Sequence, residues 1–142
     1  MTIAAQLAGA LWTSPNTLCG LLAGTVGLAF GARVCWRRRD LAVVFQHLPW
    51  GTGALTLGNV ILHTGDDLDA PCLTYAHRSG RGIEVSIRLA DHERAHVYQY
   101  MLLGPLFLPV YLLCGGISVR NPFERAADRY ARCGHGWWPG RD

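Results

Sequence analysis

Residues 97–119 carry no charge and separate two short polar segments, HERAH at 92–96 and ERAAD at 124–128. As one straight helix this uncharged run would be roughly 35 Å long, enough to cross a membrane. It is interrupted by Gly104–Pro105, Pro109 and Gly115–Gly116, and glycine and proline at such places end helices and make turns. If the polar segments share one site, the chain must fold back. We therefore expect a helix ending near Gly104, a short apolar helix over 106–114, and a return into a helix that carries Glu124.

The HERAH segment has the spacing of a metal site on a helix. His92 and His96 lie one turn apart on one face and can direct two imidazoles at one point. Glu93 reaches the edge of that point, where it can accept a proton from a metal-bound water. Catalytic zinc usually takes three protein ligands, and Glu124 is the candidate for the third. Asp128, one turn further along, can accept a hydrogen bond from the second ring nitrogen of a ligand histidine.

Simpler interpretations of the same residues stay open. HExxH occurs by chance, and two histidines on an amphipathic helix can be packed or solvated without a metal. Asn121 as N-cap, Pro122 at the first helical position and Glu124 at the third form a variant of the capping box, which also needs no metal.

HERAH followed by FERAADRYA resembles the gluzincin zinc metallopeptidases, and among them the membrane-associated HtpX-type and CAAX-prenyl-protease group. The second motif of that group runs Glu, two residues, Ala, Asp, often Arg, then Ala, and residues 124–131 match it. The stretch GTGALTLGNVIL looks like the strand that lies along the substrate cleft in this group. The resemblance implies His92, His96 and Glu124 as Zn²⁺ ligands, Glu93 as general base and Asp128 as the partner of a ligand histidine.

The chain also departs from this group. Ala95 replaces the usual glycine before the second histidine, and residues 64–88 have no counterpart. A peptidase also needs a group that stabilises the oxyanion, and Tyr130 and His135 are candidates by position only. The resemblance implies a peptide or protein as substrate.

The N-terminal segment is apolar and ends in a basic cluster. Residues 1–32 contain no charged side chain, and arginines follow at 33 and 37–39. This order indicates a transmembrane or membrane-anchoring helix whose C-terminal end faces the cytoplasm, because the basic residues of a signal peptide precede its apolar run. Ser14 as N-cap and Pro15 at the first helical position mark the helix start. The glycines at 20, 24, 27 and 31 would let another helix approach closely. We expect a bacterial inner-membrane protein with its metal-binding domain on the cytoplasmic side.

Residues 40–89 have the alternation and β-branched residues of strands. The stretches at 41–48, 53–63 and 82–89 predict a small antiparallel sheet of three strands. An acidic cluster, Asp66, Asp67 and Asp69, lies in the polar loop between the last two, and it lacks the rest of a calcium-binding loop pattern.

Together these patterns predict an α+β fold, with a membrane segment at 1–39 and a minimal zincin-like domain at 40–142. The chain has 13 arginines and no lysine, which excludes Schiff-base chemistry, and its net charge of +3 gives no reason to expect nucleic acid. The five cysteines form no CxxC pair and receive no role.

Three functions remain in view at this stage. The first is a membrane-associated zinc metallopeptidase with lipid as a neighbour. The second is a membrane protein in which zinc is structural, and the third is a small membrane protein without a metal. The sequence says nothing about the oligomeric state.

Overall fold

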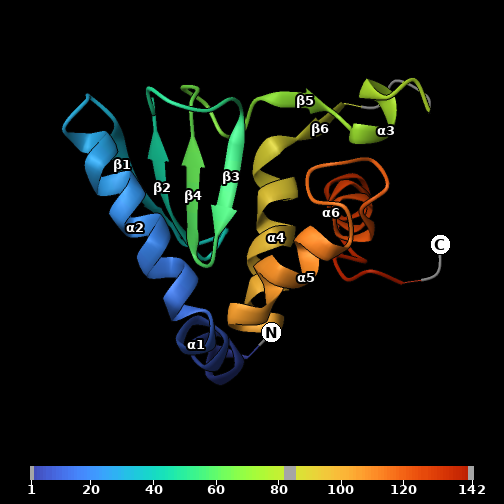
Figure 1. Cartoon of the computed structure of the whole chain (residues 1–142), viewed down its shortest axis with the longest axis horizontal. Helices are drawn as coiled ribbons and strands as arrows, with labels where there is room; N and C mark the ends of the chain where they lie inside the picture. The colour runs from blue at the N-terminus through green and yellow to red at the C-terminus, as the bar shows by residue number, and fades with distance from the viewer. Residues whose placement is uncertain (1, 82–85, 141–142) are drawn as a thin grey trace.

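The computed structural model describes residues 2–81 and 86–140 as an α+β fold (Figure 1). Its strands are β1 (Arg33–Arg37), β2 (Ala42–Gln46), β3 (Ala54–Leu57), β4 (Val60–His63), β5 (Pro71–Leu73) and β6 (Ser86–Arg88). Its helices are α1 (Ile3–Trp12), α2 (Ser14–Leu28), α3 (Tyr75–Arg78), α4 (Leu89–Leu103), α5 (Phe107–Leu113) and α6 (Pro122–Cys133), with a 3-10 turn η1 (Gly104–Leu106) between α4 and α5.

The main sheet is mixed, with the strand order β1-β2-β4-β3. β2 and β4 are parallel, while the pairs β1–β2 and β3–β4 are antiparallel. The expectation of three antiparallel strands is therefore wrong. The stretch 53–63, predicted as one strand, is the hairpin of β3 and β4, because Gly58 takes a positive φ of 61° and turns the chain. Apolar residues continue on both sides of this short turn, so the sequence pattern reads as one strand.

The third predicted strand does not join the main sheet. Residues 82–85 lie outside the described residues, and β6 pairs with β5 in a separate two-stranded ladder. Because β6 ends at Arg88 and α4 begins at Leu89, this ladder determines where the HERAH helix starts.

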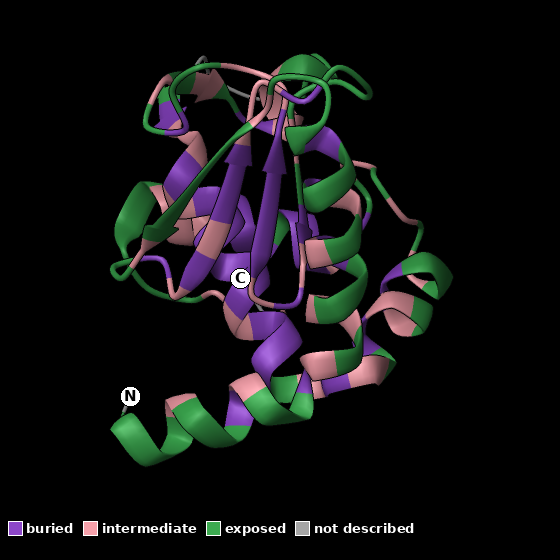
Figure 2. Ribbon diagram, turned by 90° about the vertical axis from the view of Figure 1, so that its left-hand side faces the viewer, coloured by how far each residue is buried: buried purple, intermediate pink, exposed green. Residues whose placement is uncertain are grey.

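The main sheet lies between α2 and α4, and alternate residues of its central strands enter two apolar clusters. Val44 and Ile61 pack with Val97 of α4. Phe45 and Val60 belong to the cluster on the α2 side. Figure 2 shows the buried central strands and the largely exposed α1 below them. Because side chains alternate across a strand, the central strands β2 and β4 are buried on both faces of the sheet.

The N-terminal helix α2 packs against the sheet through its glycines. It has 15 residues, with Thr13 as N-cap instead of the predicted Ser14 and Pro15 in the first turn. A Cβ at Gly24 would lie 2.3 Å from the Phe45 ring, and one at Gly20 would lie 2.7 Å from Val60 Cβ. The glycine spacing that predicted contact with a second helix therefore allows close contact with β2 and β4.

Among the described residues, a single helical stretch, Leu89–Leu113, is long and apolar enough to cross a membrane by length and composition. It is bent where the sequence predicts: Gly104 has a φ of 57° and ends α4, and η1 turns the chain into α5. Asn121 then caps α6 by accepting a hydrogen bond from Phe123 N at 3.0 Å, as predicted. α6 returns alongside α4 (Figure 1), so the two polar segments meet.

Candidate metal centre

Helix α4 presents its two histidines and Glu93 to one side and Arg94 to another. Arg94 Nε donates to Asp40 Oδ1 at 2.8 Å, and its Nη2 donates to Asp91 Oδ1 at 2.6 Å. Asp91 belongs to α4 itself and Asp40 to the loop between β1 and β2, so Arg94 ties the helix to this loop. This attachment leaves His92 and His96 on the face that meets α6.

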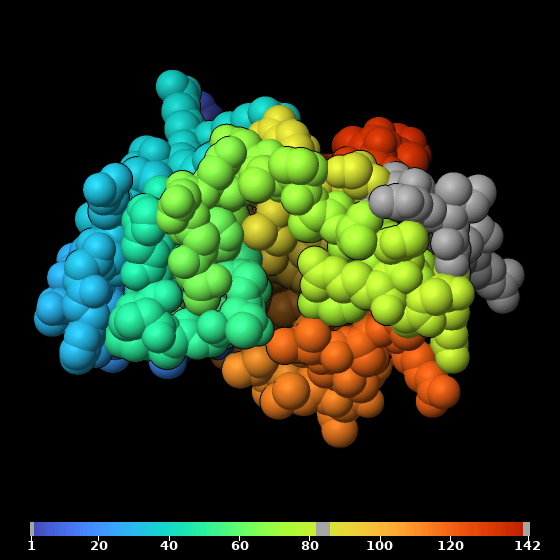
Figure 3. Space-filling view, turned by 90° about the horizontal axis from the view of Figure 1, so that it is seen from above, coloured from blue at the N-terminus to red at the C-terminus, as the bar shows by residue number. Residues whose placement is uncertain are grey.

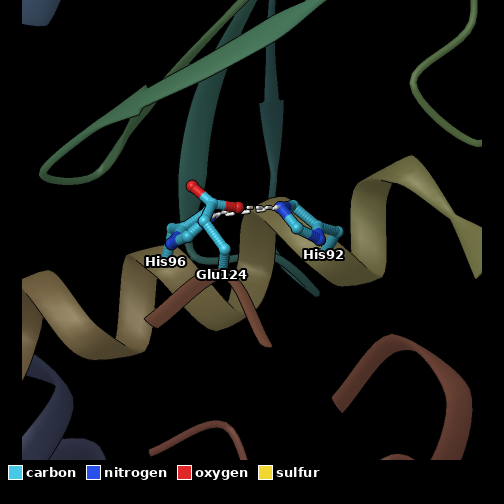
Figure 4. A group of neighbouring side chains, drawn as sticks. All are labelled: His92, His96 and Glu124. Atoms are coloured by element: carbon cyan, nitrogen blue, oxygen red, sulfur yellow. Dashed lines mark hydrogen bonds and ion pairs between the residues drawn. The ribbon is translucent and has the colours of Figure 1, made fainter. Parts of the chain in front are cut away.

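His92, His96 and Glu124 converge on one point (Figure 4). His92 Nε2 lies 3.1 Å from His96 Nε2 and 3.1 Å from Glu124 Oε2, and His96 Nε2 lies 3.4 Å from the same oxygen. Ligand atoms around a tetrahedral zinc, each about 2.0–2.1 Å from the metal, are about 3.3 Å apart. The three separations therefore match the edges of such a site, and this buried group can hold a metal ion.

Each of the three side chains is oriented by a further residue. His92 Nδ1 lies 2.9 Å from Asp128 Oδ1, and His96 Nδ1 lies 2.8 Å from Gln99 Oε1. Both partner oxygens are acceptors, which places an N–H on Nδ1 of each ring and directs each Nε2 at the common point. Glu124 Oε1 accepts a hydrogen bond from the Tyr111 hydroxyl, and this leaves Oε2 for the same point.

The direction in which the Glu124 side chain points distinguishes two roles: joining the cluster with the histidines, or capping the start of α6. Glu124 lies in the first turn of α6, where its charge favours the helix N-terminus. Its carboxylate bonds to His92 and Tyr111, and the Asn121 backbone N–H donates instead to Ser118 O at 3.1 Å. The capping-box hydrogen bond from the Asn121 backbone N–H to the Glu124 side chain is therefore absent from this described helix end. The Glu124 carboxylate is part of the cluster instead.

The cluster is electrostatically arranged to attract a cation. Burial raises the pKa of Glu124, but His96 and His92 outweigh this effect and hold it well below its ordinary value. Burial lowers the pKa of His92, but its hydrogen bonds to Asp128 and Glu124 outweigh this effect and raise it above its ordinary value. Three buried carboxylates, those of Glu93, Glu124 and Asp128, surround two imidazoles. In water-poor surroundings this excess of negative charge favours a positive ion at the centre.

Glu93 lies beside the three converging side chains and is held in place by the edge strand. Its Oε2 accepts a hydrogen bond of 2.6 Å from Thr56 Oγ1 of β3. The side chain is buried, and it lines the same pocket as His92 and His96. Glu93 is therefore next to the metal position without being one of the three converging ligands.

The pocket opens between the main sheet and α5. Seen from above (Figure 3), a hollow lies between the strand region, α3 and the α5–α6 segment, with α4 at its base. One wall is the edge strand, with Ala54 and Leu55 beside Thr56, and the opposite wall is apolar, with Phe107, Leu108 and Ile117. A chain lying in this pocket would pass along a strand edge and over the three converging side chains.

The other candidates from the sequence lie elsewhere. Tyr130 accepts a hydrogen bond from Arg94 Nη1 at 3.3 Å, and His135 is exposed in the tail, so neither lines the pocket. Asp69 pairs with Arg37 and Arg88. The acidic loop is thus joined to arginines, and the five cysteines are free thiols.

Four residues next to the cluster were not identified from the sequence: Thr56, Tyr75, Gln99 and Tyr111. Gln99 follows His96 by three residues, and this helical spacing could have indicated it. The other three come from a strand, a short helix and an apolar helix far from HERAH in sequence, and no local pattern indicates them.

Comparison of the chain with protein-family models, curated protein sequences and solved structures finds no match. A function can therefore be proposed only from the structure itself. The main observation is the buried group of His92, His96 and Glu124, which can hold a metal ion.

Proposed function

We propose that this chain is a membrane-associated zinc metallopeptidase, in which His92, His96 and Glu124 hold Zn²⁺ and Glu93 acts as general base. One observation carries the proposal. Two Nε2 atoms and one carboxylate oxygen converge at tetrahedral spacing beside a buried glutamate at the base of a pocket. Two imidazoles and one carboxylate are a donor set typical of catalytic zinc, which keeps its fourth position for water.

Zinc held by these residues would lower the pKa of a bound water to about 7 and would polarise a peptide carbonyl. Glu93 accepts the proton of the attacking water and later delivers it to the nitrogen of the leaving amine. Thr56 holds the Glu93 carboxylate through the 2.6 Å hydrogen bond, so the base stays directed at the pocket. Asp128, Gln99 and Tyr111 keep the ligands in their required tautomers and orientation.

The edge strand β3 supports a peptide as substrate. β3 is an outer strand of the main sheet, and Ala54, Leu55 and Thr56 line the pocket. An outer strand has N–H and C=O groups available on its free side, and an extended peptide can pair with them by strand addition. The apolar wall opposite β3 suits apolar side chains of such a peptide.

The exposed apolar side chains of the N-terminal helices support membrane association. They recur at four-residue spacing, which places them on one face of each helix. They are Ile3, Leu7 and Leu11 of α1, and Leu18, Leu22 and Val26 of α2. The exposed arginines at 33, 38 and 39 follow α2 and would meet anionic head groups. α2 has only 15 residues and its glycine face contacts the sheet. These two features favour a helix that lies in the membrane interface over one that crosses the membrane.

Metal content tests the proposal first. Elemental analysis of the purified native chain should find about one zinc per chain, and Glu124→Ala and His96→Ala should each lose it. Asp66→Ala is the matched control, because its exposed carboxylate pairs with His47 far from the cluster and should leave the zinc content unchanged. A native chain that takes up no zinc after reconstitution would contradict the metal site.

Glu93→Gln separates a peptidase from a structural metal site. This variant should retain zinc and lose hydrolysis of peptide substrates by roughly the 10²–10⁴-fold that a general base contributes. Equal hydrolysis by native protein and Glu93→Gln would contradict the role of Glu93. Zinc without any hydrolysis of a broad peptide mixture by the native chain would leave the metal as a structural link between α4 and α6.

A further inference from the structure

The proposed reaction needs a hydrogen-bond donor for the carbonyl oxygen of the substrate, and the pocket contains four hydroxyl groups. Those of Thr56 and Tyr111 are engaged, because they donate to Glu93 and Glu124. Tyr100 is only 2% exposed and its ring lies 4.2 Å from that of Phe107, so this side chain offers little surface to a bound peptide. The fourth hydroxyl belongs to Tyr75, which is half-buried and forms no hydrogen bond among the described residues.

Tyr75 is attached to the ligand cluster at two places, and a third contact of its ring lies within α3. Its backbone N–H donates to Asp128 Oδ2 at 2.9 Å, and the other oxygen of that carboxylate holds His92. Its ring centroid lies 5.9 Å from that of His92. The guanidinium of Arg78 lies 5.4 Å from the ring centroid on the side of α3. The position of the Tyr75 side chain is therefore coupled to the residue that orients a metal ligand.

The local sequence places Tyr75 at the start of a short helix. Thr74 is buried and caps α3, because its Oγ1 accepts a hydrogen bond of 3.3 Å from His77 N. α3 packs against α6, which carries Glu124 and Asp128. Tyr75 lines both the pocket with Glu124 and the adjoining one with Asp128. It therefore borders both pockets beside the ligand cluster.

The hydroxyl of Tyr75 remains a donor at neutral pH. A phenol has an ordinary pKa of about 10, so it carries its proton at this pH. An ionised phenol would repel the negative charge that develops on the substrate, whereas the neutral phenol can donate to it.

We infer that Tyr75 stabilises the oxyanion, by donating its O–H to the carbonyl oxygen of the peptide bond that is cleaved. This inference rests on the proposed function and replaces Tyr130 and His135, the candidates from the sequence, in that role. During the reaction the water oxygen bonds to the carbonyl carbon and its proton passes to Glu93. The C–N bond then breaks and Glu93 gives the proton to the amine nitrogen. Tyr75 keeps its proton throughout, and its hydrogen bond strengthens as charge builds on the oxygen.

The test compares Tyr75→Phe with the native chain and with two matched variants. Tyr98→Phe removes a hydroxyl from the α4 surface that packs on Trp137, outside the pocket, and serves as control. Tyr130→Phe tests the candidate from the sequence. For each protein we would measure zinc content, kcat and KM on a mixture of internally quenched peptides, and the Kd of two zinc-binding peptides. One carries a tetrahedral phosphinate that mimics the oxyanion, and the other carries a thiol that binds the metal alone.

For Tyr75→Phe we expect unchanged zinc, a kcat lower by roughly 10²-fold, and a KM within about 3-fold of the native value. The phosphinic peptide should bind at least roughly 10-fold more weakly, while the thiol peptide binds equally well. Tyr98→Phe should match the native chain in every measurement.

Several results would overturn the inference. A Tyr75→Phe variant with native kcat and native phosphinate affinity would do so, and so would a loss of zinc that accompanies the loss of activity. A loss of kcat in Tyr130→Phe instead would return the role to Tyr130. These outcomes differ from failure of the proposed function, which would appear as a zinc-loaded native chain that neither cleaves the peptides nor binds the phosphinate.

Discussion

At the scale of single residues, the geometry of the candidate site depends on residues that hydrogen-bond to the three converging side chains and are not themselves among the three. Asp128 illustrates this, because its two oxygens accept from His92 Nδ1 and from the Tyr75 backbone N–H. Removing such a carboxylate leaves one imidazole free to rotate or change tautomer and leaves a buried N–H without an acceptor. The ligands alone therefore do not account for the geometry of the site.

We predict that Asp128→Ala raises the Kd for zinc by roughly 10–100-fold without removing any ligand. The measurement is competition with a chromophoric chelator at fixed pH. Asp66→Ala, which removes an exposed carboxylate far from the cluster, should keep the native Kd. Equal zinc affinity in Asp128→Ala and the native chain would show that His92 is held in place without this hydrogen bond.

A second residue-scale prediction concerns acid stability. Hydrogen bonds from Arg37 lower the pKa of Asp69 from 3.8 to about 2, against a smaller opposing effect of burial, and Arg88 adds to the lowering. Because the folded pKa is below the unfolded one, this carboxylate stabilises the fold above pH 3.8, and the contribution disappears as pH falls toward about 2. The effect is small, since the side chain is 43% exposed.

Asp69→Asn should therefore lower the free energy of unfolding at pH 6, and the difference from the native chain should shrink as pH falls from about 5 to 2. Urea denaturation at a series of pH values measures this, with Asp66→Asn as the exposed control. A difference that stays constant over this range would show that the Asp69 charge contributes nothing.

At the scale of elements, α2 depends on the absence of side chains at its contact face. Gly20, Gly24 and Gly27 are the buried residues of this helix, and each lies against an apolar side chain of the sheet or the loop after β2. Glycine costs a helix about 1 kcal/mol per residue relative to alanine, so three of them need compensation from close packing. The burial of Phe45, Leu48 and Val60 beneath the glycines supplies it.

We predict that Gly24→Val destabilises the fold by about 1–3 kcal/mol, because a Cβ there would lie 2.3 Å from Phe45 Cδ2. Thr25→Val places the same side chain on the exposed face of the same helix and should change the unfolding free energy by less than about 0.5 kcal/mol. Chemical denaturation compares the two variants. If both have native stability, α2 does not pack against β2 as described.

At the scale of the whole molecule, the candidate metal centre connects segments that are distant in the chain. His92 and His96 come from α4 and Glu124 from α6, and the loop between them includes α5. A ligand that binds the folded chain and not the unfolded chain stabilises it by mass action, by about 4 kcal/mol at 1,000 times its Kd.

Removal of the metal should therefore lower the Tm by roughly 10 °C for a domain of this size. Thermal unfolding with and without a chelator measures the shift. Glu124→Ala, which lacks a ligand, should show the same Tm in both conditions. If the Tm of the zinc-loaded native chain is the same with and without the chelator, the ion binds outside this cluster.

The exposed apolar faces of α1 and α2 predict that the whole protein binds to lipid membranes. The native protein should co-sediment with vesicles that contain anionic lipid, and added salt should weaken the binding. Leu18→Glu with Leu22→Glu introduces charge at two side chains that are 59% and 70% exposed, and should release the protein. Leu73→Glu, on β5, is the control and should bind normally. Equal binding of both variants would exclude α2 as the contact surface.

Local features of the sequence were enough to predict the parts of the site that lie on one helix or at one turn. The four-residue spacing of His92 and His96, the end of α4 at Gly104 and the cap at Asn121 depend on backbone geometry within a few residues. The return of α6 onto α4 also followed from the glycines and prolines between them.

Tertiary structure alone decided the rest. The parallel pairing of β2 with β4, the contact of α2 with the sheet, and the positions of Thr56, Tyr75 and Tyr111 around the ligands involve segments far apart in sequence. No residue pattern specifies which of several apolar faces will meet, because burial of apolar surface has no preferred direction. The sequence by itself determined which side chains could bind a metal, and packing determined which others hold them in place.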